Sequence, residues 1–216
     1  MASTDAGARS SVDRLAHFLR TRKGARRVIS VLSVFLLIGG VAMLGYPLFT
    51  NLYQDRLQGR LNKQFASPDL QQAYRDGKVE VGDSLTRIRI PAIDVDTIVV
   101  QGTTAAALRA GAGHYSKTPL PCETGNVAIA GHRTTYGKPF ANLDRVKIGD
   151  TIELATPVGG CVYEVSRDPF VVGKNDLSVI NPSPDRILTL TTCHPKGSAA
   201  QRLVIRAKYQ KDLRET

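Results

Sequence analysis

Residues 28–49 of the chain, VISVLSVFLLIGGVAMLGYPLF, contain no charged side chain. As a helix that rises about 1.5 Å per residue, a segment of this length spans the roughly 30 Å hydrocarbon core of a bilayer. Seven basic residues but only two acidic ones precede it, and such an excess of positive charge marks the cytoplasmic side of a membrane helix. We therefore predict a cytoplasmic basic tail over residues 1–27 and a single-pass anchor in the cell membrane over residues 28–49, with the remainder of the chain outside.

Two other interpretations of the apolar segment are a cleaved signal peptide and a buried core helix. A signal peptide has a shorter apolar core and a cleavage site of small residues, and no clear site of that kind follows here. A core helix does not fit the run of basic side chains directly before the segment. Both comparisons favour the anchor.

The predicted external domain has room for one substantial core, because its roughly 130 residues form a single domain more readily than two. Much of the net charge of +10 lies in the N-terminal tail. The mildly basic remainder suits an anionic membrane or wall surface. We expect no nucleic-acid partner, since the charges are scattered and no nucleic-acid-binding motif occurs.

Residues 50–83 are predicted to form a helical stalk. Apolar side chains recur there at helical spacing, at Leu57, Leu61 and Phe65. Ser67-Pro68-Asp69 then interrupts the pattern, with Ser67 as the cap of a second short helix that runs through Tyr74. The apolar repeat is too short to predict a coiled-coil dimer.

From residue 85 onward the alternation of apolar and polar side chains has the period of a β-strand. Strand-like segments are RIRI and DVDTIVVQ around a bend at Pro91, NVAIAGHR, DTIELAT and CVYEVS around the turn PVGG, and RILTLTTC followed by RLVIRAKY. The Ala-rich residues 103–111 form a short helix. About eight short strands with few helices predict a mainly β fold, a closed eight-stranded β-barrel over residues 84–212.

The strand ILTLTTCHP, residues 187–195, ends by presenting a thiol. Pro195 stops the strand because it lacks the backbone N–H that a β-ladder needs. Cys193 therefore lies at the C-terminal end of a strand. His194 points to the opposite face and is a poor base for its neighbour, so a partner for the thiol must come from elsewhere in the chain.

A nucleophilic thiol needs a nearby base or cation to hold it as thiolate. Of the four histidines, His17 lies in the predicted tail, which leaves His114 and His132, both preceded by glycine. His132 is favoured because it ends a strand whose small and branched residues resemble those before Cys193. If the two strands are parallel neighbours, their ends coincide and the imidazole approaches the sulfur.

Arg202 follows on the next strand, which antiparallel pairing returns to Cys193. A guanidinium there can donate hydrogen bonds to a substrate carbonyl or a developing oxyanion. Taken singly, a strand cysteine is more often a packing residue and an arginine a solvated one. The other two cysteines, Cys122 and Cys161, either form a disulfide that leaves Cys193 free or remain small buried thiols.

TLTTC (189–193), the arginine nine residues later and AGHR (130–133) together resemble the signature of sortases. The resemblance also takes in RIRIPAIDVDTIVVQG, GAGHY and PFANLDRVKIGDTIEL, and so covers about residues 84–209. Sortases are membrane-anchored bacterial cysteine transpeptidases built on an eight-stranded β-barrel. The resemblance therefore implies this fold and this activity, with no cofactor. No metal site is expected, because the acidic residues do not cluster.

The resemblance also implies a mechanism. Cys193 attacks the Thr–Gly carbonyl of a sorting signal and forms a thioacyl intermediate, while Arg202 positions the substrate and stabilises the oxyanion. His132 protonates the leaving amine and later deprotonates an incoming amine. The implied partners are secreted proteins with a C-terminal sorting signal and a peptidoglycan precursor or another amine nucleophile.

GHY (113–115) and TTCHP (191–195) look like the corresponding motifs of class E sortases of high-GC Gram-positive bacteria. In that class a tyrosine at the position of Tyr115 is associated with a preference for an LAxTG signal over LPxTG. Tyr115, Thr191 and Thr192 are accordingly expected to bind the substrate. The other interpretation of Tyr115 is a core aromatic with its hydroxyl at the surface.

Three further classes of protein compete with this assignment. Pilin-polymerising sortases usually carry a lid with an Asp-Pro-aromatic motif before the barrel, whereas these letters occur here only late, at 168–170. L,D-transpeptidases place their cysteine after Ser-His-Gly, and here two threonines precede the thiol. An anchored binding domain without catalysis has no need to retain Cys193, His132 and Arg202 together.

Overall fold

The computed structural model describes residues 23–213, so most of the predicted basic tail, with His17, lies outside the described residues. The chain divides into two compact units between residues 48 and 49. Helix α2 (Lys23–Phe65) runs through this division. It is the one described helix that is long and apolar enough to cross a membrane, and its apolar window is not buried by the protein. These properties fit a single-pass anchor.

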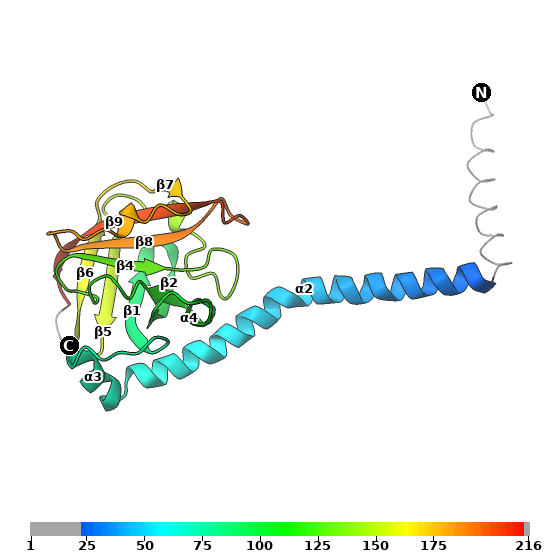
Figure 1. The fold of residues 1–216 in the computed structure, drawn as a ribbon, viewed down its shortest axis with the longest axis horizontal. Helices are drawn as coiled ribbons and strands as arrows, with labels where there is room; N and C mark the ends of the chain where they lie inside the picture. Colours follow the sequence, from blue (N-terminus) through cyan, green and yellow to red (C-terminus); the bar gives the residue numbers. More distant parts are fainter. Residues whose placement is uncertain (1–22, 214–216) are drawn as a thin grey trace, which may run out of the picture. The chain divides into compact units, whose positions relative to one another are not determined.

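The second unit is a closed β-barrel (Figure 1). Its strands are β1 (Ser84–Ile90), β2 (Val95–Gln101), β3 (Ala112–His114), β4 (Asn126–Ala130), β5 (Thr151–Thr156), β6 (Gly159–Val165), β7 (Phe170–Gly173), β8 (Ile187–His194) and β9 (Gln201–Asp212). The strands pair in the order β6-β5-β1-β2-β3-β4-β8-β9, and β6 pairs back with β9 to close a ring of eight. Strand β7 does not belong to this ring and pairs with the first part of β9. The predicted eight-stranded barrel is confirmed, and its closure removes exposed sheet edges.

Helix α3 (Pro68–Arg75) lies between α2 and β1, and the connections between strands contain α4 (Ala105–Ala110) and the 3₁₀ turns η1 (Pro91–Ile93), η2 (Leu143–Arg145) and η3 (Ser178–Ile180). Helix α3 begins where the sequence predicts it. The Ser67 hydroxyl accepts a hydrogen bond from the Leu70 amide at 3.3 Å, and Pro68 occupies a position whose N–H has no partner within the helix.

Alternation of side chains along β4 and β8 decides which residues fill the barrel and which face outward. Val127 and Ile129 of β4 and Leu188 and Leu190 of β8 belong to the buried core. Because successive side chains point to opposite faces of a strand, the residues between them lie on the outer face of the sheet. Cys193, three positions after Leu190, is placed on this outer face.

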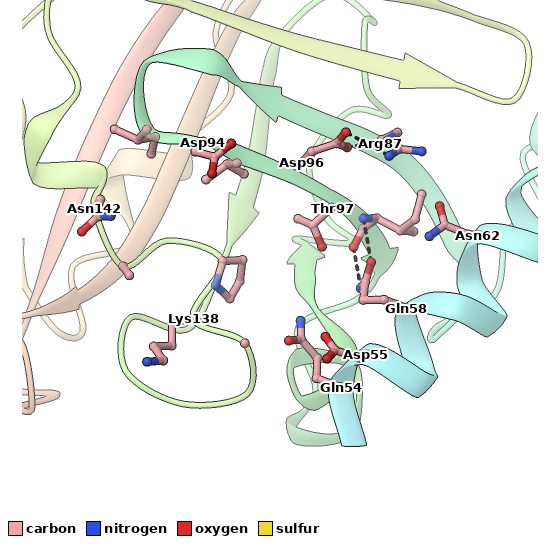
Figure 2. A pocket seen from close by; sticks show the side chains of 16 residues that line it. Gln54, Asp55, Gln58, Asn62, Arg87, Asp94, Asp96, Thr97, Lys138 and Asn142 are labelled. Carbon is pink, nitrogen blue, oxygen red and sulfur yellow. Dashed lines mark hydrogen bonds and ion pairs between the residues drawn. The ribbon is translucent and has the colours of Figure 1, made fainter. Parts of the chain in front are cut away.

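The C-terminal part of α2 packs on the barrel. Leu61 contacts a small buried group that includes Ile98 and Val100 of β2. Figure 2 shows the Gln58 amide at the edge of β2, where it donates to the Ile98 carbonyl at 3.2 Å and accepts from the Ile98 amide at 2.9 Å. Pairing of β2 with β3 begins only at Val99, so this side chain satisfies strand groups that β3 does not reach.

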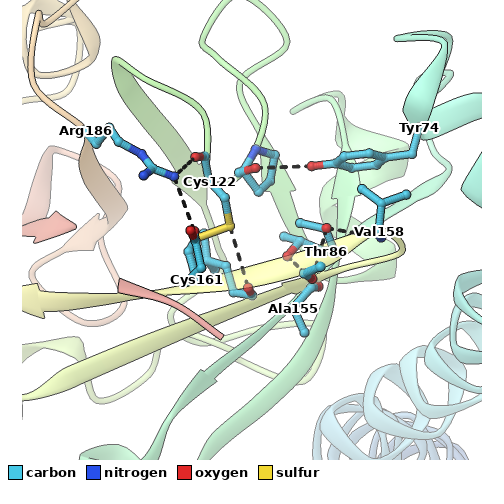
Figure 3. The surroundings of a disulfide bond; sticks show 12 residues. Tyr74, Thr86, Cys122, Ala155, Val158, Cys161 and Arg186 are labelled. Carbon is cyan, nitrogen blue, oxygen red and sulfur yellow. Dashed lines mark hydrogen bonds and ion pairs between the residues drawn. A yellow bond between two sulfur atoms is a disulfide. The ribbon is translucent and has the colours of Figure 1, made fainter. Parts of the chain in front are cut away.

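A disulfide joins Cys122 to Cys161, which settles the alternative that the sequence leaves open (Figure 3). Cys161 is buried on β6, and Cys122 lies in the connection between β3 and β4. The Arg186 guanidinium donates to the carbonyl of Cys122, and the Tyr74 hydroxyl of α3 donates to the carbonyl of Pro121 at 3.2 Å. The loop that follows Tyr115 is therefore tied to three separate elements.

Replacing Leu61 by alanine is expected to lower the free energy of unfolding by about 2–4 kcal/mol, because the change leaves a cavity against β2. Leu61 is 8% exposed, whereas Leu52 on the same helix is 63% exposed. Leu52→Ala should therefore change stability by less than about 0.5 kcal/mol. Urea unfolding of both variants in one non-ionic detergent, followed by circular dichroism, measures the difference. Equal losses would contradict the packing of α2 on the barrel.

Candidate active site

The parallel pairing of β4 with β8 brings His132 and Cys193 to the same end of the barrel. The ladder runs from Asn126 opposite Ile187 to Ala130 opposite Thr191. The Gly131 amide then donates to the Thr191 carbonyl at 3.1 Å. His132 follows Ala130 by two residues, as Cys193 follows Thr191. The predicted adjacency of the two strands is confirmed, and His132 and Cys193 follow the last ladder pair by the same number of residues.

Cys193 is the free cysteine of the described chain and is half-buried. It lies directly opposite Arg202 in the antiparallel β8–β9 ladder, as the sequence predicts. Nη1 of Arg202 donates to the carbonyls of Ala199 at 3.0 Å and Gln201 at 2.9 Å. These bonds hold the guanidinium at the turn between the two strands, beside the thiol-bearing residue.

His132 is half-buried, and this burial lowers the pKa of its imidazole, which favours the neutral form. Its ring lies 5.3 Å from the ring of Tyr136, centroid to centroid, and its carbonyl accepts from the Phe140 amide at 3.1 Å. The preceding Gly131 has no room for a side chain, because a Cβ there would lie 2.5 Å from the Phe140 ring. A neutral imidazole held in this way can take up a proton.

His114, the other candidate base, is fully buried in the wall of the barrel. One ring nitrogen lies 2.7 Å from the Gln101 amide oxygen, and the other lies 2.9 Å from the Pro119 carbonyl and 3.0 Å from the Thr118 hydroxyl. Burial lowers the pKa of His114 to about 4. Its nitrogens are therefore engaged within the protein, so the structure supports the choice of His132.

The predicted substrate residues fall on two faces of the sheet. The Tyr115 hydroxyl lies 3.2 Å from the Thr191 hydroxyl, and both residues belong to the outer face that carries Cys193. Thr192 lies on the inner face with Leu190, is buried, and donates its hydroxyl hydrogen bond to the Gly131 carbonyl at 2.8 Å. The hydroxyl of Thr192 thus holds the residue before His132, and its expected contact with the substrate stays a prediction.

The side chain of Arg133 also belongs to the site, although the sequence pattern predicted no role for it. Its side chain is buried, and Nη1 donates to the Cys193 carbonyl at 3.1 Å and lies 3.1 Å from Nδ1 of His194. Nη2 pairs with the Asp144 carboxylate at 3.0 Å. Burial alone would raise the pKa of Asp144, but hydrogen bonding and the nearby guanidinium outweigh it and hold that pKa below its usual value. The only signal in the sequence is the position of this residue directly after His132.

The chain belongs to the sortase family. The family model described as "Sortase domain" matches residues 88–210, which include the described residues of the candidate active site. Sortases are cysteine transpeptidases, and a half-buried free thiol at a strand end, opposite an arginine and beside a histidine-bearing loop, is consistent with this class of enzyme.

Known relatives support the same assignment. The chain is 28% identical to Sortase SrtE1 of Streptomyces coelicolor over 88% of its own length and spans 60% of the length of that relative. The solved structure of the Sortase D5 transpeptidase of Clostridium perfringens matches with a TM-score of 0.63 and 28% identity, covering 73% of this chain and 98% of that one. Sortase E1 of S. coelicolor, solved with a tripeptide in its active site, matches with a TM-score of 0.55 and 28% identity over 61% of this chain and 90% of that one.

The buried His114 predicts a loss of stability in mild acid. Its pKa is about 4 in the folded protein and 6.5 ordinarily, so the unfolded chain takes up the proton first as the pH falls. Neutral His114 therefore makes its full contribution to the free energy of unfolding above pH 6.5, and this contribution is lost as the pH falls toward 4. Urea unfolding between pH 7 and pH 4 should show a steeper loss for the wild type than for His114→Gln, which cannot titrate. An equal dependence of stability on pH in the two proteins would contradict the lowered pKa of His114.

Proposed function

We propose that this protein cleaves a sorting signal of the LAxTG or LPxTG type between Thr and Gly and transfers the acyl group to an amine of the cell wall. The observation that carries the proposal is the common end of β4 and β8, where His132 and Cys193 occupy matching positions and Arg202 lies opposite the cysteine. The match to sortases of class E, one of which was solved with a tripeptide in its active site, supports a peptide substrate.

The chemistry assigns one step to each side chain. The Cys193 sulfur attacks the Thr carbonyl, the C–N bond to Gly breaks, and a thioester forms. The thiol proton passes to His132, which delivers it to the leaving amine and later removes a proton from the incoming amine. Arg202 keeps its Nη1 on two backbone carbonyls, and its remaining N–H groups serve the oxyanion of the tetrahedral intermediate.

The proposed location is the outer side of the cell membrane, with the N-terminus in the cytoplasm. The excess of basic residues before the apolar segment supports this orientation. The Cys122–Cys161 disulfide supports an oxidising compartment for the barrel. In that position the enzyme meets secreted proteins that carry a sorting signal and the amine groups of peptidoglycan precursors.

Incubation with LAxTG and LPxTG peptides should give a covalent adduct whose mass equals the peptide up to Thr and whose site is Cys193. Adding an amine such as triglycine should release the adduct as an amide. Cys193→Ala should give no adduct, and His132→Gln or Arg202→Gln should lower the rate of cleavage at least about 100-fold. Intact-protein mass spectrometry and chromatography of the products provide the readout. Cleavage by Cys193→Ala at the wild-type rate would end the proposal.

Tyr115→Phe tests the proposed preference for LAxTG. If the hydroxyl that contacts Thr191 selects between the signals, its removal should lower the ratio of kcat/KM for LAxTG to that for LPxTG about 3- to 10-fold, the effect of one hydrogen bond. The matched control is Tyr53→Phe, an exposed tyrosine of α2. An unchanged ratio in Tyr115→Phe would remove this residue from substrate selection.

A further inference from the structure

The β4–β8 ladder directs His132 and Cys193 to the same end of the barrel, but it ends before it includes either residue. The last pair of β4 with β8 joins Ala130 to Thr191, and the last backbone–backbone hydrogen bond between the two segments joins Gly131 to Thr191. His132 itself lies in the connection toward η2. Its position relative to the sulfur must therefore be maintained by contacts other than the backbone ladder.

Arg133 makes contacts that suit this purpose. It follows His132 directly in the chain, and its guanidinium bonds the backbone carbonyl of Cys193 itself, the next residue's imidazole and the Asp144 carboxylate, at 3.0 to 3.1 Å. A planar guanidinium presents its donors in a rigid fork. One side chain thus connects the neighbour of the base to the backbone of the nucleophile and anchors both to η2.

The electrostatics of Arg133 do not suit a residue that only fills space. It is 5% exposed, while its Asp144 partner has a side chain that is 42% exposed, so the cation loses more hydration than the anion does. Its Nε is buried without a hydrogen-bond partner in the described part of the chain. A buried charge and an unpaired donor both cost stability, and an apolar side chain of similar volume would avoid both costs.

We propose that Arg133 is a positioning residue that holds the His132 loop against the Cys193 backbone, and thereby sets the approach of the imidazole to the sulfur. Arg133 bonds the backbone carbonyl of Cys193 and not its thiol, and in this role it acts through His132 and Cys193. Lys196, whose ammonium lies 3.9 Å from the Asp144 carboxylate, extends the same network to the turn between β8 and β9. This inference rests on the proposed function for its kinetic consequence.

The kinetic test compares Arg133→Gln with Arg145→Gln in the full-length protein in detergent. Arg145 is an exposed arginine of the neighbouring η2, so its variant has the same change of charge without the buried network. Arg133→Gln should lower kcat for peptide cleavage about 10- to 100-fold, because small misplacements of reacting groups have effects of this size, and should leave KM within about 3-fold.

Arg133→Lys keeps the charge but cannot reach three acceptors with one ammonium, so its kcat should fall between those of the wild type and Arg133→Gln. If Arg133→Gln does not fold, as judged by circular dichroism, Arg133→Lys takes its place in the test. Its kcat should then be at least about 3-fold lower than that of the wild type. A kcat for Arg133→Gln within 3-fold of that for Arg145→Gln would overturn the proposal.

A second measurement does not depend on catalysis. In a His132→Cys background, mild oxidation links residues 132 and 193 at a rate that reports how closely they are held. Adding Arg133→Gln should slow this crosslink at least about 5-fold, and adding Arg145→Gln should not. Equal crosslinking rates would overturn the role of Arg133 even in an active enzyme. Slower crosslinking without peptide cleavage by the parent protein would uphold that role while the proposed function fails.

Discussion

The site depends on one constraint, the parallel pairing of β4 with β8. Only parallel neighbours end at the same edge of a sheet, so only this arrangement brings two residues that each follow a strand to matching positions. Antiparallel pairing of β8 with β9 then adds Arg202 from a strand that starts where β8 ends. Backbone pairing thus brings the strand ends that carry or precede these three residues to one edge of the barrel.

The core beneath the site makes this arrangement specific. Val127, Ile129, Leu188 and Leu190 fill the barrel, and a slip of one residue in either strand would turn these side chains outward and the site inward. Thr192, on the inner face, adds a hydroxyl bond to the Gly131 carbonyl. The same alternation that buries the apolar side chains therefore keeps the thiol on the outer face.

Much of the fold could be predicted from the sequence because alternating strands, the capped helix after Ser67 and the long apolar segment each carry a local signal. His132 and Arg202 could be selected because one closely follows, and the other belongs to, a strand with such a signal. The short strands β3 and β7 have three and four residues, too few for a recognisable alternation. The role of Arg133 depends on partners about 10 and 60 residues away, contacts that follow from the topology of the fold and leave no local pattern.

Between β4 and β8 the chain builds η2, β5, β6, β7 and η3 before it returns. The parallel ladder fixes where the two strands end, so the parts of this excursion that do not contact β4 or Arg133 can change in length or shape without shifting the strand ends. Two parts of the excursion do make such contacts: η2 contacts Arg133 through Asp144, and η3 contacts Asn126, at the start of β4, through the Val179 carbonyl, which accepts from the Asn126 amide. A barrel of this design separates the strand ends of the reaction centre from loops that can be remodelled, so the peptide preference could change without rebuilding the ladder.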